Sequence, residues 1–369
     1  MTAVRAAVLP RTRGQLEIQE LELDPPRPGE VQVRVHSTGI CHSDQNAIDG
    51  TADTPCPAVL GHEGAGVVER VGAGVDIEVG QHVALSWMPS CGRCEECARD
   101  LRHLCRTAWE AMGTGGLLDG TSRLSRDGAP VYHYSLLSTF AERTVVAAGS
   151  CIAIPDDVPF DVASLIGCCV ATGTGAVWRT AGVRPGDRVA VFGCGGVGLS
   201  AVMGAAAAGA STIVAVDVVP EKLVVAAELG ADVTVAWAGG ADETSALVRE
   251  ASGGGVDAAI EATGRPEAAR AAFLSTRVRG AAVLIGIPRA GAEVSFPALP
   301  IPRMERRVLG SMYGSTVPER DFPEIVERYI RGELPIDRLI SHRFPLADVA
   351  EAFELLRRGA TLRAVLTMD

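Results

Sequence analysis

The stretch that decides the fold is RVAVFGCGGVG, residues 188–198. Its first five residues, Arg188 and four apolar residues, predict a buried strand, and a Gly-x-Gly-x-x-Gly turn follows them directly. A small-residue segment at about 199–208 then predicts a helix, and a second apolar run, 212–216, ends at Asp217. This order of strand, glycine turn, helix, strand and acidic residue is the context that a dinucleotide-binding fingerprint requires.

The glycine turn predicts a cofactor site, because its glycines let the backbone approach a pyrophosphate that the next helix N-terminus holds. Asp217 would accept hydrogen bonds from the ribose hydroxyls and would repel a 2′-phosphate, so NAD is favoured over NADP. Lys222, the sole lysine, could reach the same ribose. A tight turn that binds nothing is the alternative, and it leaves this context unexplained. The turn residues assigned to the cofactor are Gly193, Gly195, Gly196, Val197 and Gly198.

Strand-like and helix-like segments alternate after this turn, with helices predicted at 221–229, 244–251 and 266–276 and strands at 233–235, 256–261 and 281–286. This alternation predicts an α/β fold with a doubly wound parallel sheet. Residues 1 to about 150 differ, because short strands such as 31–35, 67–71 and 82–85 are separated by glycine turns. They predict a small barrel-like β domain. The tail after about Tyr313 predicts helices at 322–331 and 346–358 and a last strand at 362–367.

A thiolate, an imidazole and a second thiolate are available for a catalytic metal. His62 lies in the glycine-rich segment Gly61–Gly66, Cys41 precedes it by twenty-one residues, and Cys168 follows far downstream. Two cysteines and one histidine suit a catalytic zinc, which takes three protein ligands and keeps one position open. Cys169, next to Cys168, leaves a choice of ligand.

Four further cysteines have the spacing C-x2-C-x2-C-x7-C, and they are Cys91, Cys94, Cys97 and Cys105. Four thiolates within so short a segment predict a closed structural zinc site. An iron–sulfur cluster is the alternative, since thiolate spacing alone does not choose the metal.

The composition excludes several classes of protein. A net charge of −11 and a pI of about 5.2 argue against nucleic acid or an anionic membrane as the partner. The first ten residues lack the pattern of a signal peptide, and the most apolar run, 199–216, is interrupted by Gly204, Gly209 and Ser211. We therefore expect a cytoplasmic protein without a membrane span, whose ten cysteines serve metal chemistry rather than disulfides.

Several motifs together resemble one family. They are Cys41-His42-Ser43-Asp44, Gly61–Gly66, the four-cysteine run, Asp119–Arg123, Leu165–Cys168, Gly193–Gly198 and Leu362-Arg363. In this order and spacing the chain resembles the zinc-dependent medium-chain alcohol dehydrogenases over essentially its whole length. It is most similar to the long dimeric branch that includes glutathione-dependent formaldehyde dehydrogenase. The resemblance implies a GroES-like catalytic domain at 1–169, a Rossmann NAD-binding domain at 170–312 and a C-terminal segment, 313–369, that completes the catalytic domain.

The resemblance also implies roles for individual residues. Cys41, His62 and Cys168 would bind the catalytic zinc, with Glu63 behind the metal. Asp44 would orient His62, and Ser43 would hydrogen-bond the substrate oxygen. The cofactor would be held by His42 and Arg363 at the pyrophosphate, and by Gly195, Gly196, Asp217 and Lys222 at the adenosine half, with Arg265 nearby. The implied activity is NAD-dependent interconversion of an alcohol and its aldehyde or ketone by a homodimer with two zinc ions per chain.

Two departures from the family bear on the substrate. Asn46 stands where many relatives carry a histidine that passes the proton to solvent. Trp109 stands where the glutathione-dependent enzymes carry an arginine, and the nearby segment 50–57 is shortened. We therefore expect a bulkier alcohol or aldehyde against an apolar wall that includes Trp109, although an ordinary packed tryptophan is an equal alternative. Rival functions are oxidation of a mycothiol-type thiol adduct, aldehyde dismutation, a non-catalytic nucleotide-binding relative and an iron–sulfur redox protein.

Overall fold

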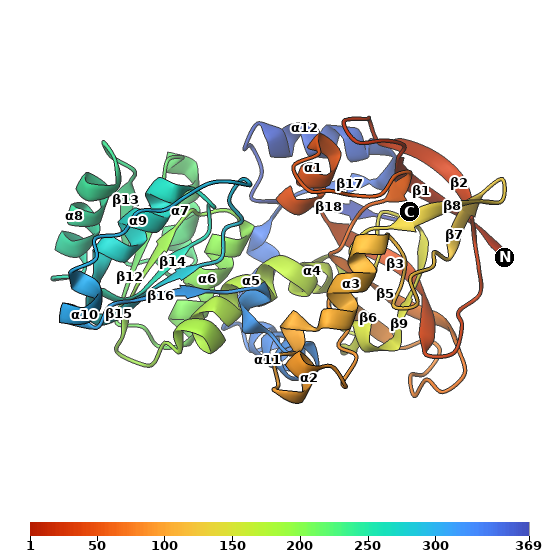
Figure 1. Cartoon of the computed structure of the whole chain (residues 1–369), viewed down its shortest axis with the longest axis horizontal. Helices are drawn as coiled ribbons and strands as arrows, with labels where there is room; N and C mark the ends of the chain where they lie inside the picture. The colour runs from red at the N-terminus through yellow and green to blue at the C-terminus, as the bar shows by residue number, and fades with distance from the viewer. Residues whose placement is uncertain (369) are drawn as a thin grey trace. The chain divides into compact units, whose positions relative to one another are not determined.

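The computed structural model describes residues 1–368, which fold into two compact units (Figure 1). The first unit comprises Met1–Cys168, Val317–Ile330 and the chain from Ile336 onward. The second comprises Cys169–Thr316 and Arg331–Pro335. The first unit is therefore built from both ends of the chain.

The first unit consists mainly of antiparallel strands. A closed barrel has the order β1-β2-β7-β8-β4, and its strands are β1 (Thr2–Leu9), β2 (Glu17–Leu23), β4 (Ala58–Val59), β7 (Leu124–Arg126) and β8 (Ala129–His133). A second sheet has the order β10-β6-β5-β3-β18-β17, with β9 paired to β3. Its strands are β3 (Glu30–Gly39), β5 (Gly64–Val71), β6 (His82–Leu85), β9 (Arg143–Ala147), β10 (Cys151–Ala153), β17 (Ile340–Pro345) and β18 (Arg363–Thr367).

Strand β3 organises the second sheet. The alternation at 31–35 predicted a strand with one solvated face, and on that face Arg34 is exposed but Gln32 is only 1% exposed and donates a hydrogen bond to Glu69. Strands β5 and β9 both pair with this part of β3. At its far end, β18 pairs with β3 in antiparallel register, with Val365 opposite Gly39. This pairing brings the C-terminal strand, which begins at Arg363, next to the segment that follows β3.

The helices of the first unit lie around these sheets, and they are α1 (His42–Asp49), α2 (Glu95–Ala98), α3 (Arg106–Thr114), α4 (Phe160–Leu165), α11 (Pro318–Ile330) and α12 (Val349–Arg357). Helix α12 was predicted from Leu346, but a short 3-10 turn, Leu346–Asp348, precedes it. Buried residues of β1, β2, β8, α12 and β18 share one core, in which Phe140 and Phe353 meet edge to face with ring centroids 6.0 Å apart.

The second unit contains the predicted parallel sheet, which confirms the α/β fold class. Its strand order is β13-β12-β11-β14-β15-β16, and all neighbours run parallel. The strands are β11 (Arg188–Phe192), β12 (Thr212–Asp217), β13 (Val233–Ala236), β14 (Val256–Glu261), β15 (Thr276–Leu284) and β16 (Arg307–Gly310). The helices are α5 (Ala171–Gly175), α6 (Gly196–Ala207), α7 (Pro220–Glu228), α8 (Ala241–Ala251), α9 (Pro266–Ser275) and α10 (Pro300–Met304).

Strand β15 begins earlier than the sequence pattern predicted. The predicted helix ran to residue 276 and the strand began at 281, whereas the strand begins at Thr276 and an irregularity in register separates its first pair from the rest. The three residues in this irregular part, 277–279, are exposed, so they lack the apolar pattern that marks a buried strand.

The helical stretch Phe160–Ala181 was not predicted. It contains two five-to-six-residue π-helical turns, Ile166–Val170 and Ala176–Ala181, that interrupt the regular helix. Among the described residues, it is the one helix long and apolar enough to cross a membrane, but 78% of its apolar window is buried inside the folded chain. Core helices pass the same test, so the segment is weak support for a membrane span.

Candidate active site

The predicted catalytic ligands come together in the first unit. Cys41 caps the start of α1, His62 lies just before β5, and Cys168 lies in the π-helical turn Ile166–Val170. Their ligand atoms, together with a carboxylate oxygen of Glu63, all lie within 4.8 Å of one another. Cys169 is fully buried and does not belong to this cluster of described residues.

Asp44 holds two of these residues in place. Its Oδ1 lies 3.1 Å from His62 Nδ1 and accepts the amide of Gly61, while Oδ2 accepts the amide of Cys41 at 3.0 Å. Asp44 is 0% exposed, so these contacts fix its position. Because Nδ1 faces Asp44, Nε2 is the nitrogen of His62 left to face a metal.

The donor set fits a cation. The pKa of the Cys41 thiol lies well below its usual range, because of hydrogen bonding with Cys168 first and interactions with His62 after it. A thiolate is the form that binds metal. Two soft sulfur donors from free cysteines and one imidazole match the ligand chemistry of zinc.

Glu63 and Arg363 form a buried ion pair beside this cluster. An Nη of Arg363 donates to Glu63 Oε2, and the two side chains are 4% and 0% exposed. Burial raises the pKa of Glu63 to about 7, and the charge of Arg363 opposes the rise. The family resemblance implied Glu63 behind the metal and Arg363 at the cofactor. In the structure, the Arg363 guanidinium has the Glu63 carboxylate as its partner within the first unit.

The remaining residues of the Cys41–Asp44 motif differ in exposure. His42 is exposed, while Ser43 is partly buried, and the Oγ of Ser43 lies 3.8 Å from Cys41 Sγ.

Tyr134 is a neighbour of this motif that the sequence did not predict. Its hydroxyl donates to the carbonyl of Ser43 at 2.8 Å, and its ring meets His62 edge-on at 5.8 Å. A lone tyrosine after a short strand carries no motif that could have marked it.

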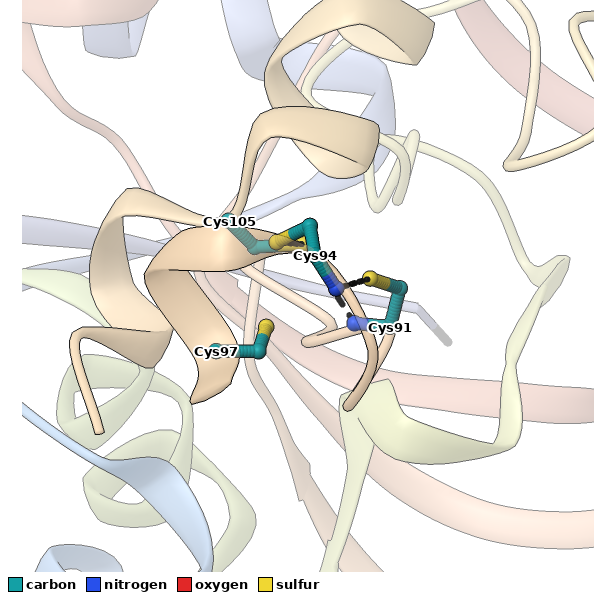
Figure 2. A group of neighbouring side chains, drawn as sticks. All are labelled: Cys91, Cys94, Cys97 and Cys105. Atoms are coloured by element: carbon teal, nitrogen blue, oxygen red, sulfur yellow. Dashed lines mark hydrogen bonds between the residues drawn. The ribbon is translucent and has the colours of Figure 1, made fainter. Parts of the chain in front are cut away.

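The four-cysteine group forms a second cluster, in which the four sulfur atoms lie within 4.8 Å of one another (Figure 2). Cys94 and Cys105 Sγ are 3.8 Å apart, and two sulfurs about 2.3 Å from one zinc ion at the tetrahedral angle would be separated by about the same distance. Amides of Cys91 and Cys94 donate to sulfur at 3.3 Å. Burial alone would raise the pKa of Cys91, but hydrogen bonds from Thr107 and from the backbone outweigh it and lower the pKa to about 6.

The glycine turn of the second unit lies between β11 and α6, as predicted. Gly193 has a φ of +94°, which favours glycine, and a side chain at Gly198 would collide with the carbonyl of Gly193. A Cβ at Gly195 would meet no atom of the described residues within 4 Å. The backbone there is therefore open to a ligand at the N-terminus of α6, which fits a pyrophosphate.

The acidic residue and the cations expected at the cofactor lie in the same unit. Asp217 ends β12, and its carboxylate accepts the amides of Cys194 at 2.6 Å and Val219 at 2.9 Å. These bonds hold the carboxylate beside the glycine turn. Lys222 lies in the first turns of α7, and Arg265 is the exposed residue that precedes α9.

Trp109 belongs to a pair of tryptophans. It is 40% exposed on α3, which begins directly after Cys105, and its amide donates to the Cys105 carbonyl at 3.1 Å. Its ring meets Trp87 edge to face, with centroids 6.2 Å apart and planes at 76°. Sequence reasoning did not single out Trp87, because the contact joins separate elements.

Comparisons with known proteins show the family of the chain. Residues 27–156 match the alcohol dehydrogenase GroES-like domain, and residues 196–331 match the zinc-binding dehydrogenase family. An S-(hydroxymethyl)glutathione dehydrogenase of Synechocystis is 38% identical over 367 residues, with 98% of this chain and 99% of that protein covered.

Solved structures agree with the sequence matches. A zinc-binding-domain alcohol dehydrogenase protein from Burkholderia ambifaria has a TM-score of 0.95 and 36% identity, covering 100% of this chain and 99% of the other. Benzyl alcohol dehydrogenase from Acinetobacter calcoaceticus has a TM-score of 0.94 and 31% identity, covering 100% of both chains. Two further similar dehydrogenase structures, from E. coli at 25% identity and from Sinorhizobium meliloti at 26%, contain NADH and NADP, with TM-scores of 0.82 and 0.81 and 100% of both chains covered. The chain therefore belongs to the zinc-dependent medium-chain alcohol dehydrogenase family, and it is an enzyme that uses zinc and a nicotinamide dinucleotide.

Proposed function

We propose that the protein interconverts a bulky, aromatic alcohol and its aldehyde, with NAD as the hydride carrier. The Trp87–Trp109 pair is the observation that carries this proposal, because it supplies a partly exposed aromatic surface in the unit that contains the predicted metal ligands. Benzyl alcohol dehydrogenase, one of the similar solved structures, is named for a substrate of this class. Aromatic rings pack favourably against tryptophan in edge-to-face and offset geometries.

The connection between the tryptophans and the metal ligands follows from strand β6. Gly167, the residue before Cys168, packs so closely on the carbonyl of Leu85 that a side chain there would collide with it. Leu85 ends β6, and Trp87 follows two residues later. Trp87 therefore follows closely on the strand end that contacts the backbone before Cys168. This placement supports a role for the tryptophan pair as one wall of the substrate pocket.

The chain's own residues have separate tasks in this proposal. Cys41, His62 and Cys168 hold the catalytic zinc, which when bound polarises the substrate oxygen as a Lewis acid. Asp44 keeps His62 Nε2 directed at the metal. Ser43 accepts and passes the hydroxyl proton, and its backbone is held by Tyr134. His42 is exposed and can carry the proton on or contact the cofactor phosphate, since Asn46 does not titrate.

The cofactor preference rests on Asp217. Its carboxylate lies at the end of β12 next to the glycine turn, where the ribose of a dinucleotide is bound in this kind of fold. A 2′-phosphate would bring like charges together there, so the proposal is NAD rather than NADP. Lys222 and Arg265, which lie in the same unit as the glycine turn, are assigned to the same cofactor.

The proposed assembly is a homodimer located in the cytoplasm. Strand β16 ends the parallel sheet, its outer edge pairs with no strand among residues 1–368, and exposed Leu299 and Ile301 precede it. An open edge beside apolar residues favours pairing with a second copy.

The cysteines support the proposed location in the cytoplasm, because all ten are free thiols, which is typical of a reducing compartment. Light scattering and cell fractionation would test the two statements separately.

A second candidate function is oxidation of a hydroxymethyl thiol adduct. The 38% identical relative is named for S-(hydroxymethyl)glutathione, which favours this reaction class. Trp109 opposes it, because an indole lacks the positive charge that would attract a charged thiol such as glutathione.

The experiment that tests the proposal measures steady-state rates with a series of substrates, using protein whose zinc content has been determined. NAD and NADP are compared against benzylic, branched and short alcohols, and against formaldehyde with glutathione or mycothiol. We expect kcat/KM with NAD to be at least about tenfold higher for benzylic than for short alcohols, since a buried aromatic ring adds on the order of 1–3 kcal/mol. A preference for the thiol adduct would replace the proposal with the second candidate.

A further inference from the structure

Arg306 of the second unit is a buried arginine whose Nε has no hydrogen-bond acceptor among residues 1–368. It lies just before β16 and is only 8% exposed. Its Nε is fully buried and has no hydrogen-bond partner, and none of the ion pairs found among residues 1–368 involves this side chain. Its one described contact is with the face of Phe273, whose ring centroid lies 5.9 Å from the guanidinium carbon. Burying Nε without an acceptor is costly, and the two Nη atoms are not among the fully buried atoms that lack a partner, so a small ligand can reach them from solvent.

A second arginine converges on the same place. Nη1 of Arg249, at the end of α8, donates to the carbonyl of Thr276 at 3.0 Å, and the Thr276 hydroxyl donates to the carbonyl of Phe273 at 2.7 Å. Both guanidinium groups therefore reach the junction of α9 and β15, one over the ring of Phe273 and one at the backbone next to it. Burial, followed by the charge of Arg249, lowers the pKa of Arg306.

Three carboxylates in the segments around Arg249 and Arg306 pair with other arginines, and exposed Glu250, next to Arg249, is in none of the ion pairs found among residues 1–368. Asp257 pairs with Arg277 at 2.5 Å, and Glu305, the neighbour of Arg306 in the chain, pairs with Arg279 at 3.2 Å. Asp242 of α8 pairs with Arg270 at 3.5 Å. Arg306 and Arg249 therefore have no ion-pair partner among residues 1–368.

We propose that Arg306 and Arg249 form a binding site for a small oxyanion, such as inorganic phosphate, sulfate or a terminal phosphoryl group. The small exposed fraction of Arg306 favours an ion over a protein surface, and a planar guanidinium matches the oxygens of phosphate. The site lies at the amino ends of the parallel strands, because Arg306 precedes β16 and Arg249 precedes β14. The glycine turn follows β11, so the nucleotide site lies at the carboxyl ends of the strands, on the other side of the sheet from Arg306 and Arg249 along the strand direction.

The test measures thermal unfolding of the zinc-loaded enzyme in saturating NAD, which keeps phosphate away from the glycine turn. Inorganic phosphate and sulfate are titrated against sodium chloride of equal ionic strength. In the wild type, we expect a saturable rise in Tm of about 2–4 °C at tenfold excess over Kd. Arg306→Gln should remove this rise and should leave the Tm without phosphate equal or higher. Arg249→Gln should weaken the phosphate affinity at least tenfold, and exposed Arg303→Gln is the matched control that should keep the full response.

Four outcomes would overturn the proposal. The first is a wild type whose Tm does not respond to either anion, and the second is a full response in Arg306→Gln. The third is a loss of Tm in Arg306→Gln that is the same with and without phosphate, which would mean that the folded chain already satisfies the guanidinium. The fourth is an effect of Arg306→Gln that disappears when the protein is diluted, which would assign the acceptor to a second copy of the chain.

Discussion

The two metal clusters of the first unit have similar donor atoms but are built in opposite ways. Cys91, Cys94, Cys97 and Cys105 come from one short segment and bring only thiols. The other cluster draws Cys41, His62 and Cys168 from distant parts of the chain and lies beside the buried carboxylates of Asp44 and Glu63. The local cluster can shape its own segment, whereas the dispersed cluster requires the folded unit before it exists.

This difference separates a structural role from a chemical one. A closed set of four thiols leaves no position for a substrate, while two thiols and one imidazole leave one open. Buried carboxylates lie beside the dispersed cluster, where we expect them to orient a ligand and balance charge, whereas Glu95 and Glu96 beside the local cluster are not buried. We therefore expect damage to the local cluster to appear in stability, and damage to the dispersed cluster to appear in turnover.

The largest expected effect is on the local cluster. Cys94→Ser should lower the zinc content from two ions to one per chain and should cost more than about 5 kcal/mol of folding free energy, because structural zinc stabilises its segment directly. Metal analysis and thermal unfolding measure the two quantities. Cys56→Ser, a partly exposed thiol outside both clusters, is the control. A Cys94→Ser protein with wild-type Tm and two zinc ions would show that the four thiols hold no structural metal.

The next effect is on turnover at the dispersed cluster. Cys41→Ser should lower kcat/KM by at least about 10³-fold, since the metal contributes several kcal/mol to stabilisation of charge in the transition state. Binding of NAD, measured by fluorescence titration, should be unchanged because the glycine turn lies in the other unit. Rates near those of the wild type would mean that Cys41 is not a ligand of the catalytic metal.

The ion pair beside that cluster should matter somewhat less. Arg363→Met leaves Glu63 buried without its cation, and we expect a loss of about 3–5 kcal/mol in unfolding free energy. The double substitution Glu63→Gln with Arg363→Met should recover at least half of this loss, because no unpaired charge remains. Denaturant unfolding of all three variants gives the coupling energy, and additive losses would refute a stabilising pair.

The smallest effect concerns the orientation of His62. Asp44→Asn keeps the size of the side chain but removes its charge, so zinc affinity at the dispersed cluster should fall by about 10–100-fold. Competition with a chelator measures the affinity of each site in the same protein. The affinity of the four-cysteine cluster should stay unchanged, and an equal loss at both sites would mean that the substitution acts through general unfolding.

Sequence reasoning performed best where the signal is local. Strands β6, β11, β12 and β14 have the bounds that the apolar runs predicted, and the fold class follows from their alternation with helices. It failed for Phe160–Ala181, where π-helical turns break the 3.6-residue period on which the prediction of helices depends. It also placed Arg363 at the cofactor by resemblance, without foreseeing the contact with Glu63, which lies three hundred residues away.

The sequence by itself determined the parallel sheet with its glycine turn and the four-cysteine cluster, because each is encoded within a short segment whose spacing sets its geometry. Only the tertiary structure decided that Tyr134 holds Ser43, that Trp87 meets Trp109, and that Arg306 is buried without a carboxylate. These contacts join residues from separate strands and helices. Their geometry depends on how whole elements pack, and single-residue types carry no record of that packing.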